Sequence, residues 1–400
     1  MNILIIPSWY PSPENPNTGI FIKEQAILFA KHFPEHNIGI STWGSNHKSL
    51  LLEVAKPFQL LMKLFKKPQN HLKQFAPNCI EYFSPTYTWT RIILKGNIKN
   101  IISANEKNIK NFEQQYGRID LIHAHVSHPG GYVAMQISQR LHIPYVITEH
   151  MTPFPFSVYH KDGKISKLIT QPLAMASKTI CVSDFLKKSI TIQAQAELCL
   201  INNFIDEDFF IPKQIKTRNE APISLLFIGR LVPQKGIDIL LKAFKILLET
   251  DLNLKLTIGG TGEYEKDYQL LCNELGLGKN VNWLGNLDRN QVRDTLQECN
   301  IFILPSRNEN NPVVILEALA CGKPVITTSC GGPEEMITQI DGLIAEPENP
   351  DDLSNKIQVL LNDLSNYNSN TIRSNFMKNH SSLIGANKIQ DVYKSIVSNT

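Results

Sequence analysis

Residues 301–326 read IFILPSRNENNPVVILEALACGKPVI, and this stretch decides the fold expected for the second half of the chain. It consists of an apolar strand, a polar loop, a short helical segment and a second apolar strand. Strands that alternate with helices in this way are typical of parallel α/β sheets. Ligands of such sheets bind beyond the carboxyl ends of the strands. We therefore expect ligand-binding groups in the loop at residues 305–312.

Two carboxylates mark this loop and the helix after it. Glu309 lies in the loop, and Glu317 follows eight residues later inside the expected helix. With this spacing, one carboxylate can meet one end of a ligand while the other meets its far end. The alternative is an ordinary strand–loop–helix unit whose carboxylates have no ligand.

The start of the same helix is a candidate phosphate site. Pro312 suits a first helical position, where its missing N–H is not needed. The amide groups of Val313, Val314 and Ile315 are then left without partners inside the helix. A helix N-terminus with free amides and a positive dipole end attracts phosphate.

Two cations stand at the end of another apolar strand, in the segment ISLLFIGRLVPQKGIDILLKAF at residues 223–244. The strand ends at Gly229, Arg230 and Lys235 follow, and a helix begins near Gly236. A planar guanidinium fork and a mobile ammonium suit the binding of a diphosphate. Fixed cations would also stabilise negative charge that develops on a leaving group. Two surface cations near a turn are the plain alternative.

Together these segments resemble the family 4 glycosyltransferases, retaining enzymes with the GT-B fold and a Glu-x7-Glu motif. The resemblance implies that Glu317 holds the ribose of a sugar nucleotide and that Glu309 lies near its sugar. It assigns the diphosphate to Arg230 and Lys235. The chain departs from the family at 310–312, where Asn-Asn-Pro replaces a Gly-Phe-Gly-like run.

Three further donor-site residues follow from the resemblance. Gly19, in the loop of residues 11–26, matches a glycine loop beneath the donor phosphates and sugar. Gly260, in TIGGTGEY at 257–264, matches a turn that borders the nucleotide. Leu284, in VNWLG at 281–285, lies at the strand end whose backbone contacts the base.

Histidines and a carboxylate end two strands of the first half. In HAHVSHPGG at 123–131 the resemblance places His125 near the reacting carbon. In TEHMTPF at 148–154, Glu149 and His150 are candidates for contacts with sugar hydroxyls or the acceptor. A histidine there could relay a proton, because its ordinary pKa is about 6.5. Histidines on one loop without a supporting carboxylate or cysteine pattern do not indicate a metal site, and we expect no metal or other cofactor.

The whole chain is expected to form two Rossmann-like, doubly wound α/β domains facing across a cleft, the GT-B fold. Residues 1–204 with a closing helix at 383–400 would bind the acceptor, and residues 205–382 the nucleotide-sugar donor. The resemblance makes the closing helix cross back to the first domain. The strands are expected at 2–6, 37–42, 119–124, 144–148, 178–182, 198–201, 223–228, 254–258, 280–284, 300–304 and 324–327.

Composition places the protein in a reducing compartment. The seven cysteines are scattered and form no CxxC pair, which argues against a disulfide framework or structural zinc. The start MNILIIPSWYPSP reads as a strand and not as a signal peptide. No segment approaches the ~20 apolar residues of a membrane span. We expect a cytoplasmic protein.

The first half is basic. Residues 1–205 carry 21 Lys or Arg and 12 Asp or Glu, which suggests an anionic partner; no nucleic-acid-binding motif accompanies the charge. Residues 46–75 hold six of the lysines beside apolar residues at helical spacing. This pattern predicts an amphipathic helix that either lies on an anionic membrane, peripheral to its inner face, or packs on the sheet.

The sequence thus predicts a retaining glycosyltransferase that moves a sugar, a hexose or N-acetylhexosamine, from a nucleoside diphosphate. We favour UDP-sugars over GDP-sugars. The expected acceptor is a hydroxyl of a glycan or lipid-linked saccharide, in bacterial surface polysaccharide biosynthesis. The alternatives are a GT-B sugar-nucleotide epimerase or phosphorylase, and a non-catalytic nucleotide-sugar-binding subunit.

Overall fold

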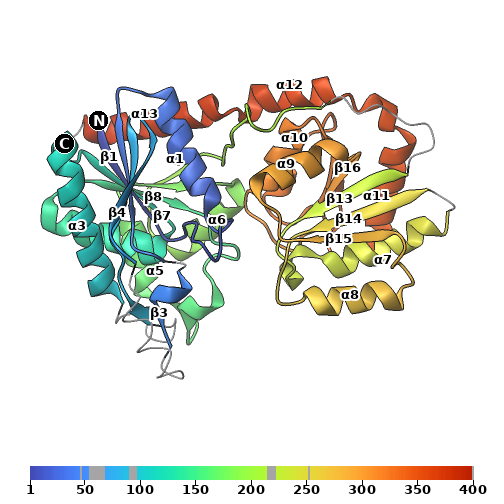
Figure 1. Ribbon diagram of the computed structural model, residues 1–400, viewed down its shortest axis with the longest axis horizontal. Coiled ribbons are helices and arrows are strands. Elements are labelled where there is room, and N and C mark those ends of the chain that lie inside the picture. The colour runs from blue at the N-terminus through green and yellow to red at the C-terminus, as the bar shows by residue number, and fades with distance from the viewer. Residues whose placement is uncertain (46, 54–67, 90–96, 214–221, 251–252, 399–400) are drawn as a thin grey trace. The chain divides into compact units, whose positions relative to one another are not determined.

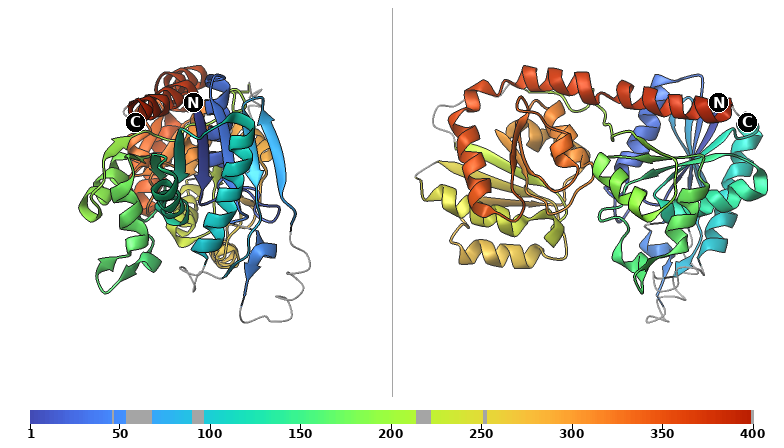
Figure 2. Two further views of the ribbon diagram at one scale, coloured as in Figure 1. Left: turned by 90° about the vertical axis from the view of Figure 1, so that its left-hand side faces the viewer. Right: turned by 180° about the vertical axis from the view of Figure 1, so that it is seen from behind.

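The computed structural model describes residues 1–45, 47–53, 68–89, 97–213, 222–250 and 253–398. They form two compact units, Met1–Asn202 with Ser382–Thr400, and Asn203–Ser381. Each unit is a twisted β-sheet covered by helices (Figures 1 and 2). Each has its own hydrophobic core.

The first unit contains an eight-stranded sheet in the order β12-β11-β8-β7-β1-β2-β5-β4. Only β4 runs antiparallel to its neighbour. The strands are β1 (Asn2–Pro7), β2 (Asn37–Thr42), β4 (His71–Ala76), β5 (Cys79–Phe83), β7 (Leu121–His125), β8 (Tyr145–Glu149), β11 (Lys178–Cys181) and β12 (Leu198–Leu200). Two short ladders pair β3 (Leu51–Leu52) with β6 (Thr88–Trp89), and β9 (His160–Lys161) with β10 (Lys164–Ile165). The helices are α1 (Ile20–His32), α3 (Ile98–Tyr116), α4 (Tyr132–Leu141), α5 (Lys167–Met175), α6 (Asp184–Gln193) and α13 (Ser382–Val397), with single turns η1 (Lys48–Leu50), η3 (Ser127–Gly131) and η4 (Ser157–Tyr159).

Side chains that alternate along β7 point to two different faces of the sheet. Ile122 and Ala124 enter the core formed with α3, α4 and α5. Because side chains alternate between the faces of a strand, His123 and His125 point to the other face. There His123 meets the ring of Tyr393 from α13, and α13 packs along α1. One face of the sheet is therefore apolar, and the other carries imidazoles.

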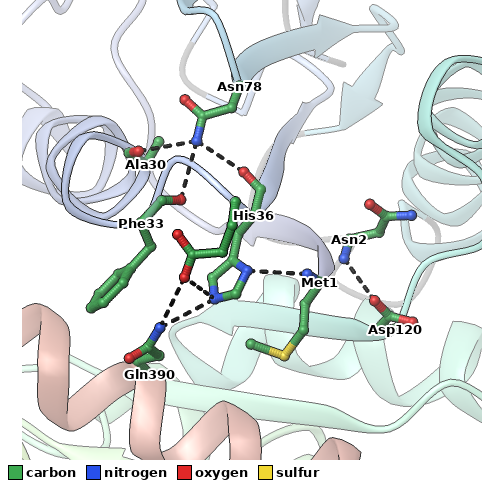
Figure 3. A network of polar contacts seen from close by, with 9 residues as sticks. Met1, Asn2, Ala30, Phe33, His36, Asn78, Asp120 and Gln390 are labelled. Atoms are coloured by element: carbon green, nitrogen blue, oxygen red, sulfur yellow. Dashed lines mark hydrogen bonds and ion pairs between the residues drawn. The ribbon is translucent and has the colours of Figure 1, made fainter.

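Polar contacts dock α13 onto α1. The His32 ring hydrogen-bonds the Ser382 hydroxyl at 2.7 Å at the start of α13. Farther along, the Gln390 amide lies 3.4 Å from both the Glu35 carboxylate and the ring of His36. Figure 3 shows this junction, where the Met1 nitrogen lies 3.0 Å from the other nitrogen of His36. The last helix is thus bonded to the first.

The second unit has a six-stranded parallel sheet in the order β15-β14-β13-β16-β17-β18. The strands are β13 (Ile223–Ile228), β14 (Leu254–Gly259), β15 (Val281–Gly285), β16 (Ile301–Leu304), β17 (Val325–Thr328) and β18 (Gly342–Ala345). The helices are α7 (Ile237–Leu248), α8 (Glu265–Glu274), α9 (Arg289–Glu298), α10 (Val313–Ala320), α11 (Pro350–Asn362) and α12 (Ser369–His380), with turns η5 (Pro233–Lys235), η6 (Pro333–Glu335) and η7 (Leu364–Asn366). This is the strand order of a Rossmann-type sheet.

Strand order fixes where each unit can bind a ligand. In the second unit the order reverses between β13 and β16, and in the first between β1 and β7. The crevice beyond the carboxyl ends of such a pair is the usual ligand site of an open α/β sheet. The loop after β13 carries Arg230 and Lys235, and the loop after β16 carries Glu309. His125 ends β7.

The eleven expected strands coincide with observed strands to within a few residues. The sequence missed the strands β4, β5 and β18 and the two short ladders β3–β6 and β9–β10. The helix predicted over 46–75 is wrong at both ends, because Leu51–Leu52 and His71–Ala76 are strands. Its central part, residues 54–67, lies outside the described residues. Among the residues described, no helix combines the length and the apolar character that crossing a membrane requires.

Candidate active site

A shared carboxylate joins the two loops at the reversal point of the second sheet. Glu309 is only 6% exposed, and its Oε1 accepts a hydrogen bond from Ser306 at 2.9 Å. The same oxygen forms an ion pair with Lys235. Lys235 and Glu309 were predicted as separate ligand-binding groups, and the structure brings them into contact. No hydrogen bond reaches Oε2 of Glu309 from the part of the chain that the structure describes.

Arg307 links the same two loops, those after β13 and β16, through a second set of bonds. Its guanidinium donates two hydrogen bonds to the carboxylate of Asp238 in the first turn of α7, at 2.9 and 2.7 Å. It also reaches the Pro233 carbonyl at 2.5 Å and Glu348 at 2.8 Å. A planar fork that bonds a carboxylate through two donors fixes direction as well as distance. The loop after β13 is therefore held in one conformation relative to that after β16.

Two glycines allow the close approach of these backbones. Gly236 caps α7 with a φ of 67°, and a Cβ there would lie 2.0 Å from the Pro305 carbonyl oxygen. Gly260 has a φ of 122°, and a Cβ there would lie 1.9 Å from the Gly229 carbonyl oxygen. The glycine predicted to border the nucleotide thus packs against the loop that carries Arg230.

Arg230 differs from the other cations of this site. It is exposed, and its guanidinium makes no hydrogen bond or ion pair within the described residues. It follows β13 after Gly229, at the carboxyl edge of the sheet. The cation predicted to meet a diphosphate is therefore accessible to a ligand from solvent.

The helix start at α10 is close to the prediction, with one correction. Pro312 is the N-cap and not the first helical residue, and α10 begins at Val313. The amide of Ile315 donates to the Pro312 carbonyl at 3.1 Å, so the prediction that it stays free is wrong. Val313 and Val314 remain the first two amides of the helix.

The unusual Asn-Asn-Pro segment before α10 is anchored on both sides. Asn311 accepts from the Asn203 amide at 2.9 Å through its side chain, and its carbonyl accepts from the Asn203 side chain at 2.9 Å. On the other side, the Gly332 amide donates to the Glu309 carbonyl at 3.0 Å. These bonds fix the segment that replaces the glycine-rich run.

Glu317 lies inside α10 and faces a cation that the sequence did not reveal. Its carboxylate is 3% exposed and lies 2.5 Å from Nη1 of Arg289, the first residue of α9. The Arg289 guanidinium also stacks on the ring of Phe210 at 4.7 Å. Burial raises the pKa of the Glu317 carboxyl, and the charge of Arg289 limits the rise. Glu309 and Glu317 thus pair with different cations.

The end of β15 presents Leu284 outward, 36% exposed. Trp283 points the other way and packs against the hydrophobic core. The half-buried indole therefore packs against the core.

In the first unit, the backbone at position 19 requires a glycine. It caps α1 with a φ of 67°, and a Cβ there would lie 2.4 Å from the Trp9 carbonyl oxygen. Any other residue would be strained and would push away the loop after β1. The N-terminus of α1 thus lies directly against that loop.

His125 and His150 are neighbours at the carboxyl edge of the first sheet. Nδ1 of His125 lies 3.0 Å from Nε2 of His150, and both rings are buried. Burial lowers the pKa of His150 to about 3 and that of His125 well below its ordinary value. Both shifts favour the neutral rings near pH 7, which counts against the proton relay that the sequence suggested.

Glu149 has a structural task that the sequence did not indicate. It is fully buried, and its two oxygens accept from the amides of Ser127, His150 and Met151 at 2.8, 2.8 and 2.9 Å. Burial raises the pKa of this carboxyl, and hydrogen bonds from Ser127 and the other amides limit the rise. The predicted acceptor contact does not fit, since both oxygens face the backbone. Glu149 instead ties the loop after β7 to that after β8.

Arg289 and Arg307 are the residues of this site that sequence reasoning missed. Asp288 and Gln291 form a capping box, a pattern that announces the start of α9 but not what its first residue meets. Arg307 follows a strand end within the quoted stretch, where an arginine is also a common surface residue. Only the packed loops reveal the partners of the two side chains.

This chain belongs to the glycosyltransferases of family 4, and it is an enzyme of that class with the GT-B fold. The model "Glycosyl transferases group 1" matches residues 208–376, and "Glycosyltransferase Family 4" matches residues 91–209. An uncharacterized glycosyltransferase of Methanocaldococcus jannaschii is 32% identical over 255 residues, 63% of this chain and 68% of that protein.

Two further proteins extend the likeness over nearly the whole chain. The putative teichuronic acid biosynthesis glycosyltransferase TuaC of Bacillus subtilis is 26% identical over 376 residues, 89% of this chain and 88% of TuaC. The solved structure of Anabaena HepE in complex with UDP has a TM-score of 0.69 at 18% identity, covering 99% of this chain and 100% of HepE. At that identity the structural likeness establishes the fold alone.

Arg289→Ala should destabilise the folded protein by about 3 kcal/mol, because it leaves the buried Glu317 carboxylate without its cation. The folded-state pKa of Glu317 is already raised and should rise further in this variant. An acid with a raised folded pKa loses stability as pH increases through the range between its unfolded and folded values. Urea denaturation should therefore show a deficit that is small near pH 4.5 and larger at pH 7.

The matched control is Arg293→Ala on the same helix. The ion pair of Arg293 with Asp294 is more exposed, and its loss should change the free energy of unfolding by less than about 1 kcal/mol. Adding Glu317→Gln to Arg289→Ala should recover part of the loss by removing the buried charge. An Arg289→Ala deficit that is the same at every pH would contradict the role given to the pair.

Glu149→Gln should destabilise the fold by about 2 kcal/mol, because a glutamine offers one acceptor oxygen where the backbone presents donors to two. Thermal or urea unfolding measures the loss. Glu106→Gln, which removes a surface partner of Arg140, should change stability by less than about 1 kcal/mol. Equal stability of the two variants would show that Glu149 does not stabilise the fold by linking the loops after β7 and β8.

Proposed function

We propose that this enzyme is a retaining glycosyltransferase that moves a hexose or N-acetylhexosamine from a UDP-sugar to a hydroxyl of a glycan or lipid-linked saccharide. The supporting observation is the geometry at the reversal point of the second sheet. There an accessible Arg230, the Lys235–Glu309 pair and the first amides of α10 all lie at the carboxyl edge of adjacent strands. This arrangement suits one diphosphate with a sugar at one end and a nucleoside at the other.

In this proposal the cations hold the leaving diphosphate. Arg230 contributes a planar fork from solvent, and Lys235 contributes a point charge whose position Glu309 fixes. As the bond between sugar and phosphate breaks, negative charge grows on the diphosphate, and both cations and the α10 amides stabilise it. The charges of these residues supply what a bound metal would otherwise provide, so we propose that no metal is needed.

Glu309 and Glu317 divide the rest of the donor between them. Glu317 would hold the ribose, with Arg289 keeping it ionised and oriented. Oε1 of Glu309 is occupied by Lys235 and Ser306, which leaves Oε2 for a hydroxyl of the sugar. Leu284 would lie beside the base, and Gly19 and Gly260 would let backbone approach the donor.

His125 would lie by the reacting carbon as a neutral imidazole. Its lowered pKa makes it a poor proton carrier at neutral pH, so it would serve as a hydrogen-bonding group. We propose that an oxygen of the leaving phosphate accepts the acceptor's proton on the face from which the phosphate departs. The new bond then forms on that same face, which retains the configuration of the sugar.

The names of related proteins guide the choice of donor and acceptor to test. HepE was solved with UDP, which makes UDP-sugars the first donors to test. TuaC is named for teichuronic acid biosynthesis, and we propose a comparable role in bacterial surface polysaccharide synthesis. Cytoplasmic location, acceptor binding by the first unit and contact of residues 46–75 with an anionic membrane belong to the same proposal.

A thermal-shift screen of UDP-, GDP- and ADP-sugars identifies the donor, because a ligand that binds the folded state raises the melting temperature by mass action. We expect a shift with UDP and at least one UDP-sugar. Turnover is then measured as UDP release with glycan acceptors. Binding without any release would favour a non-catalytic role.

Arg230→Ala should weaken UDP binding at least about tenfold, because a charge-assisted hydrogen bond contributes roughly 1.5–3 kcal/mol, while the unfolding curve stays unchanged. Titration calorimetry with UDP measures the affinity. The control is Arg140→Ala, a surface arginine paired with Glu106, which should leave affinity unaltered. Unchanged UDP affinity in Arg230→Ala would remove that residue from the diphosphate site.

A further inference from the structure

A continuous series of aromatic and imidazole rings runs between α1 and the first sheet. The ring column is defined by Phe29, Tyr393, His123, His125, His150 and Phe21, in spatial order. Adjacent ring centroids lie 5.3, 5.6, 4.5, 5.3 and 4.9 Å apart along it. Helix α1 supplies both end rings, and Tyr393 comes from α13, 270 residues after His123.

His123 is held at both of its nitrogens. Nδ1 lies 2.5 Å from the Tyr393 hydroxyl, and Nε2 lies 2.7 Å from Oγ1 of Thr148. Burial lowers the pKa of His123 to about 3, so the ring is neutral, with one donor and one acceptor nitrogen. Burial also raises the pKa of Tyr393, which keeps its hydroxyl protonated. Two hydrogen bonds in the ring plane fix the orientation of this imidazole.

The fixed ring of His123 packs against the ring of His125. The two imidazoles stack at 4.5 Å with planes 25° apart, because residues two apart on a strand share a face. On the other side, His125 contacts His150 through Nδ1 at 3.0 Å. The orientation of His125 therefore depends on two neighbouring imidazoles, of which one is set by α13.

Plain packing does not account for this arrangement. Apolar rings would fill the same space without the cost of burying hydroxyl and imidazole groups, which are tolerated only when hydrogen-bonded. Tyr393, His123 and Thr148 are 2%, 2% and 5% exposed, and their polar atoms meet each other. The polar atoms add direction, which packing alone lacks.

We propose that Tyr393 is a positioning residue for His125, acting through the orientation of His123, so that the C-terminal helix is part of the catalytic apparatus of the first unit. The proposal rests on the proposed role of His125 near the reacting carbon. Tyr393 itself does not touch substrate. Docking of α13 by Gln390 and Ser382 (Figure 3 shows Gln390) places the hydroxyl at His123.

The test uses Tyr393→Phe, which removes one oxygen and keeps the ring, and Thr148→Val, which removes the opposite bond to His123. The control is Tyr145→Phe. Tyr145 is 3% exposed, and its hydroxyl donates to the Pro172 carbonyl at 2.7 Å, away from the ring column. All three variants lose one buried hydrogen bond, so a general loss of stability should affect them alike.

UDP release from UDP-glucose, UDP-galactose and UDP-N-acetylglucosamine is measured for the full chain. Because small displacements of a reacting group are costly, kcat should fall about tenfold in Tyr393→Phe and Thr148→Val. Donor KM and UDP affinity should change less than about twofold, and Tyr145→Phe should match the wild type. Equal kcat in Tyr393→Phe and Tyr145→Phe would overturn the proposal.

A second readout is independent of turnover. Nitrogen-15 NMR of the imidazoles should show shifted or broadened His125 signals in Tyr393→Phe and unchanged ones in Tyr145→Phe. Unchanged His125 signals in Tyr393→Phe would also overturn the positioning role. If the wild type releases no UDP from any donor, the proposed function fails, while the NMR comparison still decides whether Tyr393 orients His125.

Discussion

The pairing of buried carboxylates with cations from neighbouring loops is the constraint on which the second unit's site depends. Glu309 and Glu317 are buried and Asp238 is half-buried, and Lys235, Arg289 and Arg307 compensate the water that these carboxylates lose on folding. A buried charge without its partner is strongly destabilising, so the loops after β13 and β16 and the start of α9 cannot move independently. The same bonds that hold these loops also place the groups proposed to bind a sugar nucleotide.

In the first unit, uncharged groups stabilise the buried polar side chains. Glu149 is satisfied entirely by backbone amides, and the ring column keeps its imidazoles uncharged by burial. The second unit thus holds paired charges, and the first unit holds buried, neutral, hydrogen-bonded imidazoles. In the transfer that we propose, charge develops on the leaving diphosphate, where the paired cations would stabilise it, while the sugar and the acceptor hydroxyl would need hydrogen bonds of fixed direction.

Much of the fold was predictable because the spacing of apolar residues and the positions of turn residues are local properties of the sequence. Apolar runs between turn residues located the main strands, and the Arg230–Lys235 and Glu309–Glu317 spacings pointed to the loops that we propose bind the donor. The edge strand β4 was missed because most of its residues are polar and exposed, and β18 because its apolar run of three residues after Gly342 is short. The helix expected over 46–75 failed at its ends, where pairing with other strands overrides local periodicity.

The sequence by itself determined the α/β alternation and which residues could meet a diphosphate, because each depends on local periodicity or on residue chemistry. Tertiary structure alone decided that Arg289 faces Glu317, that Glu149 turns to the backbone, and that Tyr393 reaches His123. Those outcomes depend on which surfaces meet after folding. Burial then sets the pKa values, and burial is a property of the packed chain and not of any residue in it.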